Sequence, residues 1–332
     1  MDLFLTFLGT AASVPTAARG LSATLLTRGG DRILVDCGEG TQRQLLRSRQ
    51  GLIDLDVVLL THLHGYHYLG LPGLLKTFAL RGRERPLPLV GPKGLSRLMR
   101  TLEPVIGRLS FPVEVVESDG GAVCELEGAA IEAFPTRHSV VSIGYSLVEE
   151  DRPGSFDVAA AQRLGVPSGP LFGRLQRGEE VLLDDGTTVR PEQVLGDARR
   201  GRRVVMTGDT GPCQTTLDAA WGATVLVHEA TFSEEDRDRA RETDHSTAAE
   251  AAALAEEAGV TLLALTHLGA RAMPREIRRE AEEVFRRTVV VPRDFDRIEV
   301  PNPERGAPVV HRWRGPEGRA AEGGGTLPGH GL

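Results

Sequence analysis

Three histidines of the sequence lie close enough together to share a metal ion. His62, His64 and His67 follow the apolar run at residues 57–60, which predicts a buried strand. Alternate side chains of an extended segment share a face, so His62 and His64 can point at one ion, and a turn at Gly65 can bring His67 beside them. The alternative is a group of surface or core histidines, but the chain has only nine histidines in 332 residues. Because imidazole clusters suit zinc, we interpret this one as a metal site.

Further candidate ligands follow two other predicted strands. Asp209 comes after the apolar run at 203–206, and His267 comes after the run at 261–265. The carboxyl ends of strands are where sites assemble in α/β sheets, and a loop supplies His138. The candidate ligands are His62, His64, His67, His138, Asp209 and His267. They suffice for two ions that share the Asp209 carboxylate, an arrangement that suits phosphodiester hydrolysis.

The elements that must position these residues alternate between short strands and helices. The apolar runs at 3–8 and 23–26 predict a hairpin-like start. Strands are also predicted at 32–35, 57–60, 87–90, 113–116, 122–126, 129–134, 142–148, 203–206, 223–227 and 261–265, and helices from 41 to 49, 69 to 80, 95 to 106, 247 to 258 and 274 to 287. Thr247 and Glu250 have the spacing of a capping box, and Pro274 can start the last helix. The pattern predicts an α/β fold.

Two segments differ from the rest of the chain in composition. Residues 152–203 contain Gly and Pro clusters and few apolar runs, so this stretch looks inserted into the domain. A mobile surface loop without a specific role is the alternative interpretation. From Gly315 the chain is rich in glycine, which predicts a disordered tail over residues 315–332.

Bulk properties exclude several classes of protein. A net charge of −7 argues against a protein that coats nucleic acid non-specifically, so any phosphate-rich partner must meet local basic patches. Three cysteines without a C-x-x-C pair indicate neither a disulfide framework nor a thiolate zinc site, as expected in a reducing cytosol. No apolar stretch approaches the ~18 residues of a membrane span, and we predict a cytoplasmic protein that does not bind membranes.

The ordered set of motifs resembles the ribonuclease Z family of the metallo-β-lactamase superfamily. The matching stretches are FLGT at residues 7–10, DCGEGTQ at 36–42, THLHG and GLPGLL from residue 61, FPTRHS at 134–139, GDTGPC at 208–213, HEAT at 228–231, HST at 245–247 and TH at 266–267. One such motif would indicate only the superfamily, whereas the whole set is specific to the nuclease.

The resemblance implies an αββα sandwich that cleaves precursor tRNA after the discriminator nucleotide, acts as a homodimer, and has a nuclease domain at 1–314. It also implies that a Gly/Pro-rich arm, approximately 152–197, protrudes and binds tRNA. The candidate tRNA contacts are Arg163, Gly169, Pro170, Arg174 and Arg177. His245 and Glu229 resemble residues near the leaving group, where an imidazole can donate a proton. The alternative is that Glu229 holds a loop and that His228 is simply buried.

One position departs from the family pattern. The family has H-x-H-x-D-H, and Tyr66 stands where the aspartate serves as ligand of the second metal and proposed general base. A phenol with a pKa near 10 is a poor ligand and a poor base at neutral pH. The resemblance therefore implies one firm zinc site, a weakened second site, and slower cleavage. The firm site contains His62, His64, His138 and Asp209, and the weakened site contains His67, His267 and Asp209.

Two other functions stay open at this point. Tyr66 is compatible with a catalytically degenerate homologue that binds tRNA or a regulatory partner without cutting it. A small-molecule hydrolase of the same superfamily, acting on esters, thioesters or phosphodiesters, is the second alternative. The sequence leaves open whether the metal is zinc or manganese, and whether precursors that contain CCA are cut.

Overall fold

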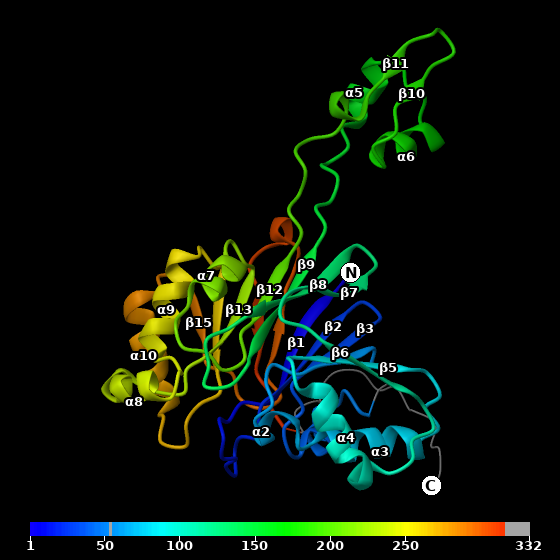
Figure 1. The fold of residues 1–332 in the computed structure, drawn as a ribbon. Coiled ribbons are helices and arrows are strands. Elements are labelled where there is room, and N and C mark those ends of the chain that lie inside the picture. Colours follow the sequence, from blue (N-terminus) through cyan, green and yellow to red (C-terminus); the bar gives the residue numbers. More distant parts are fainter. Residues whose placement is uncertain (53–54, 316–332) are drawn as a thin grey trace.

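The computed structural model describes residues 1–52 and 55–315 of the chain. Two mixed β-sheets pack face to face, and helices cover their outer faces (Figure 1). Within the described residues, the first sheet has eight strands in the order β17-β16-β1-β2-β3-β4-β5-β6, and the second has seven in the order β15-β14-β13-β12-β9-β8-β7. The αββα sandwich expected from the sequence is confirmed.

The first sheet and its helices come mainly from the N-terminal part of the chain. Its strands are β1 (Leu3–Gly9), β2 (Ala23–Arg28), β3 (Asp31–Val35), β4 (Val57–Leu59), β5 (Leu87–Gly91), β6 (Val113–Glu117), β16 (Arg297–Glu299) and β17 (Val309–His311). The helices on this side are α1 (Thr41–Arg47), α2 (Gly65–Tyr68), α3 (Leu71–Leu80) and α4 (Leu95–Ile106). β1 and β2 pair antiparallel, as the predicted hairpin requires.

The second sheet continues the chain and carries the remaining helices of the body. Its strands are β7 (Gly121–Leu126), β8 (Ala129–Pro135), β9 (Ile143–Glu149), β12 (Arg203–Met206), β13 (Val225–Glu229), β14 (Leu262–Thr266) and β15 (Thr288–Val290). Its helices are α7 (Gln214–Ala220), α8 (Arg237–Glu242), α9 (Ala248–Glu257) and α10 (Pro274–Val284), and short 3-10 turns lie at η2 (Glu234–Asp236) and η3 (Pro303–Arg305). Strands β12, β13, β14 and β15 run parallel, so their carboxyl ends meet at one edge.

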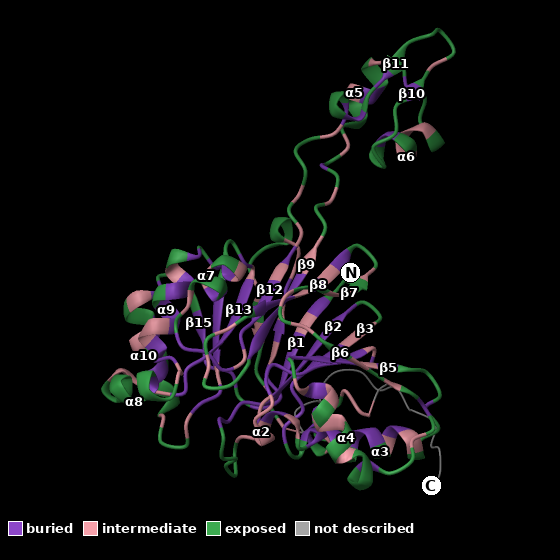
Figure 2. Cartoon of the chain, viewed as in Figure 1, coloured by how far each residue is buried: buried purple, intermediate pink, exposed green. Residues whose placement is uncertain are grey.

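Strand alternation divides the apolar residues into layers. Leu5 and Phe7 of β1 point between the sheets, where they pack in one cluster with Val204 of β12. Leu226 of β13 points outward into a second cluster beneath α9, and Leu25 of β2 lies in a third beneath the helices of the first sheet. Figure 2 shows the buried residues concentrated in both sheets. These layers hold the strand ends in fixed positions.

Residues 150–202 leave the body between β9 and β12 and form a protruding arm (Figure 1). The arm contains α5 (Val158–Arg163), α6 (Pro170–Gln176), β10 (Val181–Leu182), β11 (Thr188–Val189) and η1 (Pro191–Gln193). Its far end has a small apolar core that includes Ala161, Val166 and Leu175. The insert is therefore a folded unit with its own core, and the interpretation of it as a plain surface loop is wrong.

The root of the arm is fixed by a buried charge network. Glu149, at the end of β9, accepts hydrogen bonds from Arg28 at 2.8 Å and from Arg202 at 2.6 and 2.7 Å. Arg202 also donates to the carbonyls of Val300 and Met1. Burial opposes ionisation of Glu149, but the two arginines outweigh it and lower its pKa to about 2. The network ties both ends of the arm to the first sheet.

The C-terminal part differs from the sequence prediction. Helix α10 ends at Val284 rather than at Arg287, because Phe285 turns into the core and Thr288 begins β15. The strands β15, β16 and β17 were not predicted, since each has only three residues. The predicted disordered tail lies outside the described residues except for Gly315. No helix in the described part of the chain is long and apolar enough to cross a membrane.

Candidate metal centre

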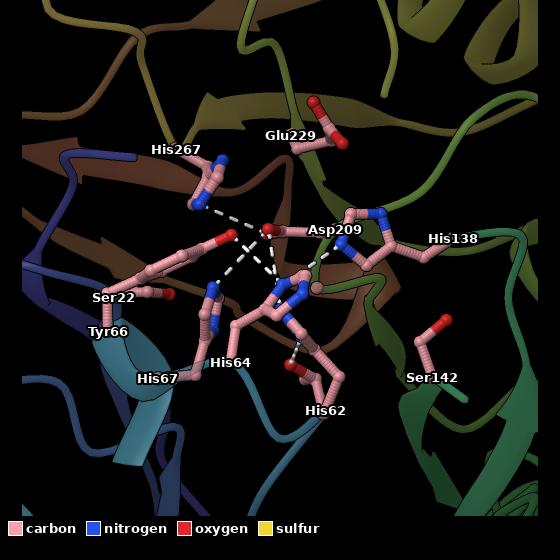
Figure 3. A network of polar contacts seen from close by, with 12 residues as sticks. Ser22, His62, His64, Tyr66, His67, His138, Ser142, Asp209, Glu229 and His267 are labelled. Carbon is pink, nitrogen blue, oxygen red and sulfur yellow. Dashed lines mark hydrogen bonds and ion pairs between the residues drawn. The ribbon is translucent and has the colours of Figure 1, made fainter. Parts of the chain in front are cut away.

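The histidines and Asp209 meet where both sheets present strand ends. His62 follows β4 of the first sheet, whereas Asp209 and His267 follow β12 and β14 of the second. The expected turn at Gly65 is the start of helix α2, which has His64 at its N-cap and buried His67 in its only turn. Figure 3 shows the five imidazoles arranged around the Asp209 carboxylate. All six candidate ligands are thus brought together.

Asp209 lies at the centre of the cluster. Its carboxylate oxygens lie 3.6 Å from Nε2 of His62, 3.4 Å from Nε2 of His67 and 3.2 Å from Nε2 of His267. These three nitrogens and both Asp209 oxygens are buried, and none has a hydrogen-bond partner among the described residues. Buried polar atoms left unpaired cost about 1–3 kcal/mol each. Five of them aimed at one another form the donor set of a cation site, so the residues present fit the metals that the sequence implies.

His64 and His138 complete one side of the cluster. Ligand atoms of His62, His64 and His138 lie within 4.8 Å of one another. Nε2 of His138 is 3.3 Å from Nδ1 of His64, and Nδ1 of His138 donates to the Asp244 carbonyl at 3.1 Å. That hydrogen bond leaves Nε2 of His138 as the ring nitrogen that faces the cluster.

A second group of residues orients the ligands. Asp36 accepts a hydrogen bond of 2.6 Å from Nδ1 of His67 and also holds Thr61, whose hydroxyl lies 3.0 Å from Nδ1 of His62. Thr231 lies 2.9 Å from Nδ1 of His267. In each case the occupied nitrogen turns Nε2 toward Asp209. Asp36 was interpreted from sequence as merely structural; its contacts make it a positioning residue of the site.

Backbone strain accompanies this arrangement. Asp36, Asp244 and His267 all have positive φ angles, of 59°, 51° and 56°. Non-glycine residues occupy this region at a cost, and they cluster at functional sites when the surroundings hold them there. No sequence pattern distinguishes these positions, although Asp36 falls within the DCGEGTQ motif.

The electrostatics of the cluster keep Asp209 ionised. Burial favours its neutral form, but His267, His67 and His62 outweigh this and hold its pKa well below the usual value. Burial also disfavours charge on His67, yet Asp209 and Asp36 raise its pKa to about 10. His267 lacks a second carboxylate partner, and burial lowers its pKa to about 4. In the metal-free protein a proton on His67 therefore stands where a cation would neutralise Asp209.

Tyr66 points into the same cluster. Its hydroxyl donates a hydrogen bond of 3.1 Å to Nδ1 of His64, and its ring centroid lies 4.8 Å from that of His67 and 6.1 Å from that of His267. Burial, assisted by the Asp209 carboxylate, raises the pKa of the phenol. Tyr66 therefore contributes a neutral hydroxyl where the family pattern has a carboxylate.

His245 and Glu229 form a pair beside the cluster. Nδ1 of His245 donates to Glu229 at 2.6 Å, and a ring nitrogen of His245 lies within 4.8 Å of ligand atoms of His138 and Asp209. Burial opposes charge on His245, but Glu229 outweighs it and raises the pKa to about 9. Glu229 is buried, and it also accepts hydrogen bonds from Thr231. Glu229 thus orients His245 and holds a loop.

His228, the neighbour of Glu229, is also buried. Its Nδ1 donates to the Glu229 carbonyl at 2.8 Å. His228 follows Leu226 by two residues in β13, so its side chain lies on the outward face of the sheet, away from the cluster. The alternative interpretation of His228 as a buried residue therefore agrees with its position.

The candidate tRNA contacts lie far out on the arm. Arg163 ends α5, Gly169 is the N-cap of α6 with a φ of 141°, and Pro170 begins that helix. The arginines are exposed, but Arg174 and Arg177 both pair with Glu179, at 2.9 and 3.1 Å. Exposed pairs of this kind are worth at most about 1 kcal/mol, so a phosphate can displace the carboxylate. The structure separates these residues from the metal cluster.

Comparison with known proteins identifies the class and then the family. The profile of the metallo-beta-lactamase superfamily matches residues 18–152. Ribonuclease Z of Natronomonas pharaonis is 48% identical over 308 residues, which cover 92% of this chain and 100% of that protein. Ribonuclease Z of Myxococcus xanthus is 47% identical over 90% of this chain and 98% of that protein. The short form of human tRNase Z superposes with a TM-score of 0.66 at 27% identity, covering 90% and 99% of the two chains. The chain belongs to the ribonuclease Z family.

Proposed function

We propose that this protein is an endoribonuclease that removes the 3′ trailer from precursor tRNA. The observation that carries the proposal is the set of five unpaired buried ligand atoms around Asp209, in a chain of the ribonuclease Z family. We infer one nuclease domain at 1–314 with the arm at approximately 152–197, acting in the cytoplasm as a homodimer.

Two groups of residues are assigned to cations. His62, His64 and His138 would hold one ion, His67 and His267 would hold the other, and Asp209 would lie between them. Bound there, a pair of zinc or manganese ions would supply Lewis acidity that activates water and neutralises charge on the scissile phosphate. Asp36, Thr61 and Thr231 keep the imidazoles in the required tautomers.

His245 is the proposed proton donor. Its raised pKa keeps the imidazole protonated at neutral pH, and it stands next to His138 and Asp209. A protonated imidazole in this place can deliver its proton to the departing 3′ oxygen of the discriminator nucleotide. Glu229 stabilises the charged ring before the transfer and fixes its orientation. Glu229 thus positions the acid and does not itself touch the substrate.

Tyr66 distinguishes the two cation sites. The site at His67 and His267 has two imidazoles and a share of Asp209, whereas the site at His62 has three imidazoles and the same share. A neutral phenol adds little to either. We therefore infer a firm first cation, a weaker second one, and slowed hydrolysis. The same observation favours a second function, a degenerate homologue that binds tRNA without cutting it.

The arm is the proposed tRNA-binding element. Its distance from the metal cluster suits a long substrate, and its exposed arginines can contact phosphate. Deleting residues 152–197 should abolish cleavage of precursor tRNA and spare hydrolysis of a small phosphodiester. Unchanged tRNA cleavage would favour the small-molecule hydrolase instead.

The proposed function is tested by cleavage of a 3′-extended tRNA with defined metal content. Wild-type protein loaded with zinc or manganese should cut, and Asp209→Asn should lose at least about 10²-fold in rate while keeping its fold. Wild-type protein that binds the RNA but leaves it intact would support the degenerate homologue. Equal cleavage by Asp209→Asn would remove the metal cluster from the mechanism.

A further inference from the structure

Two neighbouring hollows lie on the side of the first sheet that faces away from the core. The proximal hollow, about 570 Å³, is bounded by the loop at residues 15–20, helix α1 and residues 293–295. Its lining includes Arg19, Arg43, Arg47 and Arg293, against the acidic side chains of Glu39 and Asp294. Arginine is therefore in excess here, although the chain as a whole carries a net charge of −7.

The distal hollow, about 490 Å³, adjoins the first and shares Phe295 and Trp313 with it. Its arginines are Arg49, Arg297, Arg312 and Arg314, and its acidic lining residue is Glu299. Leu5 and Ile298 point into the core, so their strand neighbours Phe4 and Arg297 face outward into this hollow. The excess of positive charge continues from one hollow into the other.

Aromatic rings are interleaved with these arginines. The guanidinium of Arg49 lies 5.3 Å from the ring centroid of Trp313, and that of Arg297 lies 4.3 Å from the ring of Phe4. The rings of Phe295 and Trp313 are 5.3 Å apart. Grooves that bind single-stranded nucleic acid combine positive charge, which follows the backbone, with planar groups on which bases stack. The hollows have both features.

The proximal hollow adjoins the loops that build the metal centre. Residues 37–40 leave the centre, where the amide of Cys37 donates to the carbonyl of His67 at 2.7 Å, and lead directly into α1. The loop at 15–20 follows Ala12, whose amide donates to the carbonyl of Leu268 at 3.0 Å, one residue beyond His267. The arginine-rich surface therefore begins beside the cluster and leads away from it.

We propose that the two hollows bind the single-stranded 3′ trailer of the substrate. The inference rests on the proposed function, because precursor tRNA is the substrate that carries such a strand past the scissile phosphate. Phosphates of the trailer contact the arginines, and its bases stack on the aromatic and guanidinium planes of the distal hollow. The trailer then has its own binding surface, separate from the arm.

The test compares two precursors that differ only in trailer length. One carries about 3 nucleotides, and the other about 20, more than the 4–16 that such grooves accommodate. The variant is Arg49→Glu with Arg314→Glu, both exposed in the distal hollow. The control is Arg97→Glu with Arg100→Glu, which changes the net charge equally on the exposed surface of α4.

The expected result is specific to the long trailer. The distal variant should raise KM for the long precursor roughly 10-fold or more and leave the short one unchanged, and the control should change neither. Binding of an isolated 20-nucleotide RNA to the distal variant, measured by anisotropy, should show a salt dependence smaller by about 0.7 per lost phosphate contact.

Three outcomes would overturn the proposal. One is equal KM values of wild type and distal variant on the long precursor. Another is an equal loss on both precursors, and the third is a change in oligomeric mass with unchanged RNA binding, which would assign the hollow to a contact between copies. Failure of the wild type to cut either precursor would instead count against the proposed function, and the anisotropy measurement would still test the hollow.

Discussion

Replacing Tyr66 by aspartate should strengthen the second cation site. The substitution exchanges a neutral phenol for a carboxylate next to His67 and His267, whose Nε2 atoms lie 3.4 and 3.2 Å from Asp209. The site then has two carboxylates and two imidazoles instead of one carboxylate and two imidazoles. The added negative charge is balanced in the metal-free protein by His67, whose pKa is raised to about 10.

The size of the effect follows from the role of the missing group. A changed ligand environment typically alters metal affinity 10–100-fold, or about 1.4–2.8 kcal/mol. At limiting zinc we expect bound metal to rise from about one ion per chain toward two. A positioned general base contributes about 10²–10⁴-fold to rate, so cleavage of precursor tRNA should rise within that range.

Matched variants separate charge from shape. Tyr66→Asn has the size of aspartate without its charge, and Tyr66→Phe keeps the ring but removes the hydrogen bond to His64. Metal content by elemental analysis and cleavage rate would be measured for all four proteins at equal zinc. If Tyr66→Asp gains neither metal nor rate over Tyr66→Asn, the phenol is not what limits the second site, and the reasoning is wrong.

Three other substitutions test the surrounding network. Asp36→Asn should place an amide donor against Nδ1 of His67, disturb its tautomer, and weaken zinc binding about 10–100-fold in a titration; unchanged affinity would contradict the positioning role. Glu229→Gln should lower kcat roughly 10²-fold, because His245 loses the carboxylate that keeps it protonated, and an unchanged kcat would contradict this. Glu149→Gln should cost about 3 kcal/mol of unfolding free energy at pH 7. The pKa of Glu149 is lowered from 4.5 to about 2 on folding, so this stabilisation is present above pH 4.5 and lost as pH falls toward 2. Chemical denaturation of wild type and variant should therefore converge at low pH, and a constant difference would refute the linkage.

The ligand set could be predicted because each ligand follows an apolar run with a strong strand signal. His62, Asp209 and His267 come directly after β4, β12 and β14, and the carboxyl ends of strands gather at one place. His138 is not at a strand end of this kind and was placed through its motif. The predicted helix at 95–106 was confirmed as α4 for a related reason, since its apolar spacing is regular over three turns.

Other features depend on contacts between distant residues and leave little local signal. Asp36 reaches His67 across 31 positions of sequence, and Glu229 reaches His245 across 16. The three-residue strands β15, β16 and β17 form only because longer neighbours offer them hydrogen-bonding edges. The distal hollow is assembled from β1, the end of α1 and the C-terminal residues near Trp313, which no periodicity connects.

The most direct test of the account is the chemistry of the product ends. Zinc-loaded protein should cut a 3′-extended tRNA once, immediately after the discriminator nucleotide, leaving a 3′-hydroxyl on the tRNA and a 5′-phosphate on the trailer. Chelation of the metal should stop the reaction, and added zinc should restore it. A cut elsewhere, a 3′-phosphate product, or cleavage that survives chelation would contradict the assignment of the Asp209 cluster as the catalytic centre.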